Sequence, residues 1–283
     1  MKKGVLLIAF GGPRDREEVE AFLEELKGKP PEREVLQEVL QKYEAIGGSP
    51  FYAILDRIVE GIRRKLRGVE VVCGFLYGRP KVEEALSDLE SRGAIEVLLF
   101  PLWPYRSYLV KEALVRAEKR ADELILLWRI PEPWFIHQDY VRLWATRIKE
   151  GMLRFGKALL LFTAHSVPYE GAAEYLADLK GILDALRPFF PQVPFKLAFH
   201  SFRQGWVGPG LKEALKEAKS EGHERVIVVP IGFLCDHLET LYDLDVELKE
   251  EAEALGISME RVPCLNASED FLNFLVRRIY EAL

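Results

Sequence analysis

The 283-residue sequence predicts an α/β protein with two Rossmann-like domains, each a four-stranded parallel sheet flanked by helices, and a cleft between the domains. Continuous apolar runs that stop at glycine or proline, such as VLLIAF at 5–10, are typical of strands buried on both faces. Helical spacing of apolar residues follows these runs, and the whole series starts again near residue 158. A closed eightfold barrel is the alternative that the same alternation allows.

The first half contains four apolar runs of strand length. They span 5–10, 69–74, 95–100 and 124–128. Apolar residues spaced i, i+3, i+4 and i+7 follow the first three runs and predict amphipathic helices that begin near Val19, Val82 and Val110.

The second half repeats this order. Its strands are predicted at 158–163, 195–200, 225–231 and 257–263. A long helical segment at 134–155 separates the two series, which places the domains at 1–150 and 151–283. Ser268 caps a last helix, 268–283, that could pack back on the first domain.

The two halves differ between their first and second strands. The first half carries an excess at 29–62, which includes a Gly-Gly-Ser-Pro turn followed by Phe51 and Tyr52. Long excursions of this kind are either functional or decorative surface loops. The aromatic pair after the turn favours an insertion that forms a binding lip.

Composition excludes several classes of protein. The chain is 49% hydrophobic and 30% charged, and no apolar run reaches the roughly 18 residues of a membrane span, so we expect no integral membrane segment. A net charge of −6 without a basic, aromatic-rich stretch argues against a nucleic-acid partner. Three isolated cysteines and the lack of a leader cleavage pattern predict a reducing, cytoplasmic location.

The loops after the predicted strands carry the candidate chemistry, because ligands of parallel α/β sheets bind at the carboxyl ends of strands. No glycine-rich phosphate motif is present, which disfavours nucleotide binding. His165 follows the first strand of the second half, and Glu239 follows the third. With a strand order of 2-1-3-4 these strands are neighbours, so the two side chains predict a metal or proton-transfer site. His200 ends the second strand and receives less weight.

Carboxylates recur on one side of the helix that begins at Glu239. Asp243, Glu247 and Glu250 follow it at helical spacing, while leucines occupy the opposite side. Such a row is either a solvated acidic face or a path for hydrated divalent cations, whose preferred ligands are hard oxygens.

Four motifs together resemble the ferrochelatases. They are FGGP at the first strand, YEAIGGSP in the excess segment, TAHSVP in the second half and GFLCDHLETLYDLDVE, which contains most of the acidic row. The resemblance implies a lyase of haem biosynthesis that inserts Fe²⁺ into protoporphyrin IX or coproporphyrin III. It assigns His165 and Glu239 as catalytic and metal-binding residues and extends the metal site to Asp243 and Glu247. The partners implied are a porphyrin and ferrous iron as substrates, with no permanently bound cofactor and no iron–sulfur cluster.

The same resemblance suggests which side chains bind the porphyrin. The implied substrate-binding residues are Phe10, Lys27, Lys42, Ser49, Tyr105 and Trp206. Two alternatives stay open at this stage: a cobalt or nickel chelatase of another tetrapyrrole, which more histidines at the metal end would favour, and a non-enzymatic porphyrin or haem carrier. A carrier would be favoured by an axial ligand at position 10, where the chain has phenylalanine.

Overall fold

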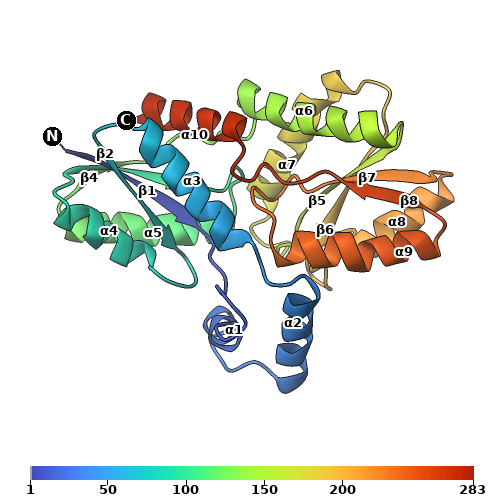
Figure 1. The fold of residues 1–283 in the computed structure, drawn as a ribbon, viewed down its shortest axis with the longest axis horizontal. Helices are drawn as coiled ribbons and strands as arrows, with labels where there is room; N and C mark the ends of the chain where they lie inside the picture. The colour runs from blue at the N-terminus through green and yellow to red at the C-terminus, as the bar shows by residue number, and fades with distance from the viewer. Residues whose placement is uncertain (1) are drawn as a thin grey trace. The chain divides into compact units, whose positions relative to one another are not determined.

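A computed structural model describes residues 2–283, which form two units. Unit 1 is the chain up to Pro133 together with Ala267–Leu283, and unit 2 is Trp134–Asn266. Each unit contains one parallel four-stranded sheet with helices on both faces (Figure 1). The strand orders are β2-β1-β3-β4 and β6-β5-β7-β8, so both sheets have the 2-1-3-4 order that was assumed for the second half.

The sheet of unit 1 is built from four short apolar strands. They are β1 (Lys3–Ala9), β2 (Val69–Phe75), β3 (Glu96–Pro101) and β4 (Leu127–Arg129). Helices α4 (Val82–Ser91) and α5 (Tyr108–Glu123) cover one face, where Leu86 and Ala117 pack with Leu6 and Leu99 of the central strands. The apolar runs of β1, β2 and β3 are largely buried because both faces of the sheet are covered there, whereas the three residues of β4 at the sheet edge are exposed.

The second face of this sheet is covered by α3 (Phe51–Lys65) and α10 (Glu269–Ala282). A Cβ atom at Gly61 would lie 2.7 Å from a methyl carbon of Leu272, so the glycine permits the two helices to approach closely. The last helix of the chain therefore belongs to unit 1.

The excess segment differs from the prediction of 29–62. Helix α3 buries Ile54, Ile58 and Ile62, so it is the helix that connects β1 and β2 and part of the core. The excursion instead consists of α1 (Val19–Lys27) and α2 (Arg33–Ala45), which stand apart from the sheet (Figure 1). The apolar spacing that begins at Val19 resembles that of a core helix, but few side chains of α1 and α2 are buried.

We expect unit 1 to fold without α1 and α2. Gly12 and Tyr52 flank the excursion and are in contact, since the Tyr52 hydroxyl donates a 2.8 Å hydrogen bond to the Gly12 carbonyl. A short Gly/Ser linker in place of 16–47 should therefore preserve cooperative thermal unfolding, with Tm lowered by about 2–4 °C for each kcal/mol of lost packing. Deletion of 29–62, which removes most of α3, should abolish the transition. Circular dichroism melts of both deletions test this, and an unfolded 16–47 variant would contradict it.

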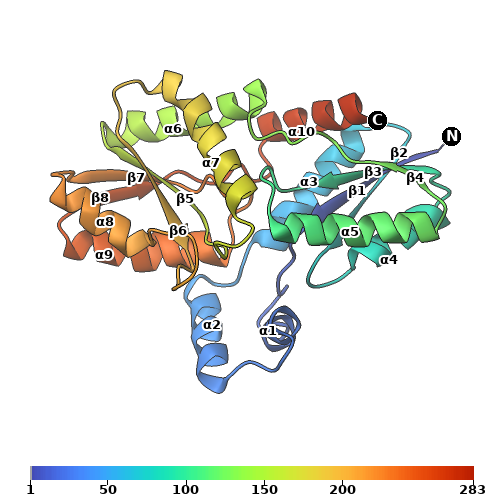
Figure 2. The ribbon, with the colours of Figure 1, turned by 180° about the vertical axis from the view of Figure 1, so that it is seen from behind.

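Unit 2 repeats the arrangement of unit 1. Its strands are β5 (Leu159–His165), β6 (Phe195–His200), β7 (Arg225–Val229) and β8 (Ser258–Arg261). One face is covered by α8 (Leu211–Ser220), the π-helix η2 (Glu239–Leu248) and α9 (Lys249–Ala254), and the other by α6 (Gln138–Phe155) and α7 (Ala173–Leu186), as Figure 2 shows from behind. A 3₁₀ turn, Arg187–Phe189, follows α7.

The boundary between the units lies at Pro133–Trp134, earlier than the predicted division at 150/151. Helix α6 is part of unit 2 because it packs on the sheet there: a Cβ atom at Gly151 would lie 2.7 Å from Val262. The turn before α6 also contacts this unit, with Phe135 against Gly181 of α7. The whole helix therefore belongs to unit 2.

The sequence led to expectations about membrane-spanning segments and about the three cysteines. Within residues 2–283, no helix has the length and apolarity that a membrane crossing requires. Cys73, Cys235 and Cys264 are free thiols.

Candidate metal and proton-transfer site

His165 is the last residue of β5, and hydrogen bonds fix the backbone around it. The Ser166 N–H donates to the His200 carbonyl (2.9 Å), and the Tyr175 hydroxyl donates to the His165 carbonyl (3.1 Å). The Ser166 hydroxyl donates to the Val207 carbonyl (2.6 Å). These bonds hold the TAHSVP segment against β6, α7 and the loop that carries Trp206.

The ring of His165 has a defined tautomer. Its Nδ1 lies 2.5 Å from the Ser166 carbonyl oxygen, which can only accept, so Nδ1 carries the proton in the neutral ring. The lone pair is then on Nε2, which lies 3.9 Å from Oε1 of Glu239. His165 and Glu239 therefore lie close together, as the sequence predicts. With 39% of its side chain exposed, His165 can reach a ligand.

Glu239 reaches this position because the loop after β7 passes close to β5. A Cβ atom at Gly232 would lie 2.7 Å from the Cα of Ala164, so only glycine allows this approach, and its N–H donates to the Thr163 carbonyl at 3.0 Å. The Thr240 hydroxyl accepts from the His237 N–H at 2.9 Å and orders the start of η2. His237 faces Phe233 at a ring distance of 4.6 Å.

His200 lies on the other side of Glu239. It ends β6 and is the register partner of His165 in the adjacent strand. Its ring is fully buried, Nδ1 lies 3.8 Å from Oε2 of Glu239, and neither ring nitrogen has a hydrogen-bond partner within residues 2–283. Burial lowers the pKa of His200 to about 3, against an opposing effect of the Glu239 carboxylate. The ring is therefore neutral at pH 7 and offers a nitrogen lone pair.

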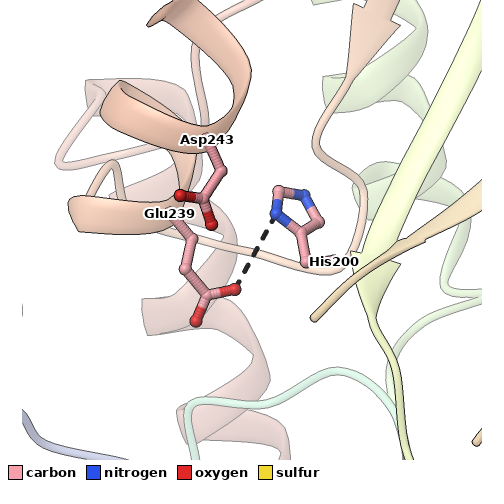
Figure 3. A group of neighbouring side chains, drawn as sticks. All are labelled: His200, Glu239 and Asp243. Atoms are coloured by element: carbon pink, nitrogen blue, oxygen red, sulfur yellow. Dashed lines mark ion pairs between the residues drawn. The ribbon is translucent and has the colours of Figure 1, made fainter. Parts of the chain in front are cut away.

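His200, Glu239 and Asp243 form a possible metal site (Figure 3). Each offers one donor atom, and these atoms lie within 4.8 Å of one another. One imidazole nitrogen with two carboxylates suits a divalent transition metal. Glu247, predicted to share the site, lies outside this group, and its Oε1 is 2.9 Å from Nζ of Lys212. His165 contacts the group through Glu239 rather than as one of its three donors.

The buried imidazole gives an expected pH dependence of stability. Between about pH 6.5 and pH 3 the unfolded chain binds a proton at His200 that the folded chain does not, so the free energy of unfolding should fall as the pH is lowered through this range. His200→Gln should remove this contribution while leaving the other titrating groups unchanged. Urea unfolding of both proteins at pH 7 and pH 5 measures the difference. Equal losses in the two proteins would contradict the assignment.

Phe10 belongs to an aromatic cluster at the carboxyl ends of three strands of unit 1. Its ring centroid lies 5.1 Å from that of Tyr77 after β2 and 6.4 Å from that of Trp103 after β3. Phe22 of α1 is the fourth member, at 6.4 Å. Phe10 is only partly buried, so the cluster presents an aromatic edge at the loops where ligands of such sheets bind.

The predicted basic and hydroxyl contacts are dispersed in unit 1. Lys27 is exposed at the end of α1. On α2, Nζ of Lys42 lies 3.5 Å from Oε1 of Glu38. Ser49 lines an open hollow of about 600 Å³ whose basic side chains are Arg14 and Arg16. Neither arginine was among the predicted residues, although both follow the first strand directly.

The two remaining predicted residues have different exposure. Tyr105 is 4% exposed and offers almost no surface to a ligand. Trp206 is half-buried, with its ring centroid 6.4 Å from that of His165 and the Arg203 guanidinium 3.8 Å above the indole. Trp206 therefore places an aromatic face next to the site.

Comparisons with known proteins identify the family of the chain. A family model described as Ferrochelatase matches residues 2–283. The ferrochelatase of Aquifex aeolicus is 31% identical over 302 residues, covering 97% of both chains, and the coproporphyrin III ferrochelatase of Anoxybacillus flavithermus is 30% identical over 96% of this chain and 93% of its own. The structure of SirB from Bacillus subtilis with Fe³⁺ matches with a TM-score of 0.65 at 17% identity, covering 99% of this chain and 95% of that chain, which supports the two-sheet fold. The chain belongs to the ferrochelatase family.

Proposed function

We propose that the protein is a ferrochelatase that inserts Fe²⁺ into a porphyrin, protoporphyrin IX or coproporphyrin III. The observation that carries this proposal is the position of Glu239 between two imidazoles, 3.9 Å from Nε2 of His165 and 3.8 Å from Nδ1 of His200. Metal insertion requires a proton acceptor and metal donors at one place, because two pyrrole protons leave as the metal enters. This group of side chains supplies both.

The residues divide the reaction between them. His165 receives the two pyrrole protons one after the other at Nε2, since its Nδ1–H is already bonded to the Ser166 carbonyl. It passes each proton on to solvent, to which 39% of its side chain is exposed, and the adjacent Glu239 carboxylate stabilises the imidazolium. His200, Glu239 and Asp243 hold the metal before insertion, and its water ligands leave stepwise. Trp206, whose ring centroid lies 6.4 Å from that of His165, packs on the macrocycle. The distortion of the macrocycle, about 1–5 kcal/mol, is supplied by binding energy.

Anaerobic incubation with Fe²⁺ and each of the two porphyrins tests the proposal. We expect the fluorescence of the free porphyrin to disappear and a haem Soret band to appear with one of the two. Catalytic metalation of neither would refute the activity, and tight binding of a porphyrin without metalation would indicate a carrier instead.

A second candidate is a chelatase that inserts Co²⁺ or Ni²⁺ into a more acidic, reduced tetrapyrrole. The observation that favours it is His200, which adds a second imidazole at the metal end. Competition between sirohydrochlorin with Co²⁺ and the two porphyrins with Fe²⁺ distinguishes the two chelatases by kcat/KM.

We also expect the protein to insert Zn²⁺ in vitro. Affinity at nitrogen and carboxylate sites generally rises from Fe²⁺ towards Cu²⁺, and Zn²⁺ is also held well, so these donors do not select iron. Fluorescence of the zinc porphyrin product measures the rate. Refusal of Zn²⁺ at saturating concentration would show that the geometry of the site selects more strictly than its donor types.

A further inference from the structure

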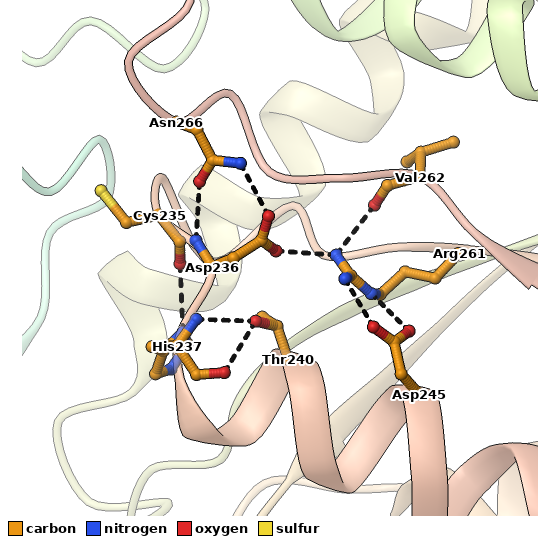
Figure 4. A network of polar contacts seen from close by, with 8 residues as sticks. All are labelled: Cys235, Asp236, His237, Thr240, Asp245, Arg261, Val262 and Asn266. Carbon is orange, nitrogen blue, oxygen red and sulfur yellow. Dashed lines mark hydrogen bonds and ion pairs between the residues drawn. The ribbon is translucent and has the colours of Figure 1, made fainter. Parts of the chain in front are cut away.

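Arg261, the last residue of β8, joins two segments of unit 2 (Figure 4). Its Nε and Nη2 each donate a 2.7 Å hydrogen bond to the carboxylate of Asp245 in η2. Its Nη1 donates to Oδ1 of Asp236 in the loop after β7, at 2.8 Å. The Arg261 side chain is 9% exposed and that of Asp236 is 12% exposed, so this pair is shielded from water, whereas the Asp245 side chain is 38% exposed.

Asp236, the anchor in the loop after β7, is also held by Asn266. Asn266 Nδ2 donates to Oδ2 of Asp236 at 2.7 Å, and Asn266 Oδ1 accepts from the Asp236 N–H at 2.8 Å. Burial alone would raise the pKa of Asp236, but Arg261 and Asn266 hold it below its usual range, so the carboxylate is ionised. The network is therefore a permanent ion pair with satisfied hydrogen bonds.

The two residues that Arg261 anchors, Asp236 and Asp245, lie in the sequence on either side of the metal donors Glu239 and Asp243. Asp236 precedes Glu239, and Asp245 follows Asp243, so the segment between the anchors carries both carboxylates of the possible metal site. This segment begins a π-helix, a rare geometry that is frequently found at functional sites. Relaxation towards an α-helix would rotate Asp243 about the helix axis relative to Glu239.

We propose that Arg261 is a positioning residue that holds Glu239 and Asp243 in metal-binding geometry by clamping the loop at Asp236 and the π-helix at Asp245. The planar guanidinium suits this role because its fork binds two carboxylates at fixed angles, which an ammonium group cannot do. Arg261 touches neither the metal donors nor the reacting atoms, so its effect passes through the backbone of the clamped segment. The inference rests on the proposed function only in taking Glu239 and Asp243 as metal donors.

Arg261→Lys tests the clamp, and Arg154→Lys is its matched control. Arg154 pairs with Glu260, the neighbour of Arg261 on the same strand, at 3.1 Å, but anchors no segment of the site. The protein is titrated with Co²⁺ in the absence of porphyrin, and the d–d absorption of the bound Co²⁺ gives the metal Kd. Steady-state assays give KM for Fe²⁺ and for porphyrin. We expect Arg261→Lys to raise the Co²⁺ Kd and the Fe²⁺ KM by about 10–100-fold with an unchanged porphyrin KM. Arg154→Lys should leave all three at the parental values.

A purely structural role gives a different result. Arg261→Lys would then lower Tm while the Co²⁺ Kd stays parental, or metal and porphyrin binding would weaken together, and either outcome overturns the proposal. If Arg261→Lys does not fold, Asp245→Asn serves as the test variant. This substitution leaves the Arg261–Asp236 pair in place and weakens only the anchor on the π-helix. A parental Co²⁺ Kd in folded Asp245→Asn refutes the clamp. Because Co²⁺ binding needs no turnover, failure of the parent to metalate a porphyrin would refute the proposed function without affecting this test.

Discussion

Replacing His165 by alanine is expected to lower kcat for metal insertion by roughly 10²–10⁴-fold while porphyrin affinity stays close to that of the parent. The ring is oriented by its Nδ1–H bond to the Ser166 carbonyl, so only Nε2 can take a proton from a substrate. Alanine removes this acceptor. Binding of the macrocycle depends on aromatic contacts that the substitution leaves in place.

Porphyrin fluorescence quenching and stopped-flow metalation together measure the two effects for His165→Ala. His223→Ala is the matched control, because His223 also lies beside a glutamate, with its Nε2 3.6 Å from Oε2 of Glu221, but it precedes β7 and so lies at the opposite end of that strand from the site. Metalation by His165→Ala at the parental rate would exclude His165 as the proton acceptor. A loss of porphyrin affinity equal to the loss of kcat would assign the histidine to binding instead.

Glu239→Gln is expected to reduce turnover to a similar extent, about 10²–10⁴-fold, and also to weaken Co²⁺ binding by about 10–100-fold. The substitution keeps the shape of the side chain but removes the charge that faces His165 and His200. Both proton transfer and metal binding use this one carboxylate, so a single change should affect both.

Glu247→Gln provides the comparison for this variant. Its carboxylate pairs with Lys212 outside the donor group, so we expect a smaller change, chiefly a higher Fe²⁺ KM. Titration with Co²⁺ and metalation kinetics at varied Fe²⁺ measure both variants. Equal losses in the two would mean that the acidic row acts as a whole rather than through Glu239.

The sequence was sufficient to predict the parallel strands and, with an assumed 2-1-3-4 strand order, the meeting of His165 with Glu239. Continuous apolar runs identify buried parallel strands, and the carboxyl-end rule then brings the residues after neighbouring strands together. The same rule applies to the second neighbour of β5, the strand β6 that ends at His200. The central position of β5 gives it two neighbours, β6 as well as β7, and the register pairs His165 with His200.

Two other features depend on tertiary contacts that spacing does not reveal. Helix α1 has the apolar period of a core helix, yet the sheet is covered by α3, whose apolar face is broader. The clamp at Arg261 joins Asp236 and Asp245, which are distant from it along the chain and meet only when β8 pairs with β7. Charged residues scattered in a sequence give no sign of such a pairing.

His165 and His200 are register partners in β5 and β6, so the geometry of the metal site depends on how these strands align as well as on which residues they carry. Side chains alternate between the two faces of a strand, so an insertion or deletion of one residue within β6 would turn His200 to the opposite face. Both histidines would still be present in the sequence, but the nitrogen donor beside Glu239 would be lost. Length changes inside this strand should therefore be far rarer among active chelatases of this type than length changes in the loop that follows it.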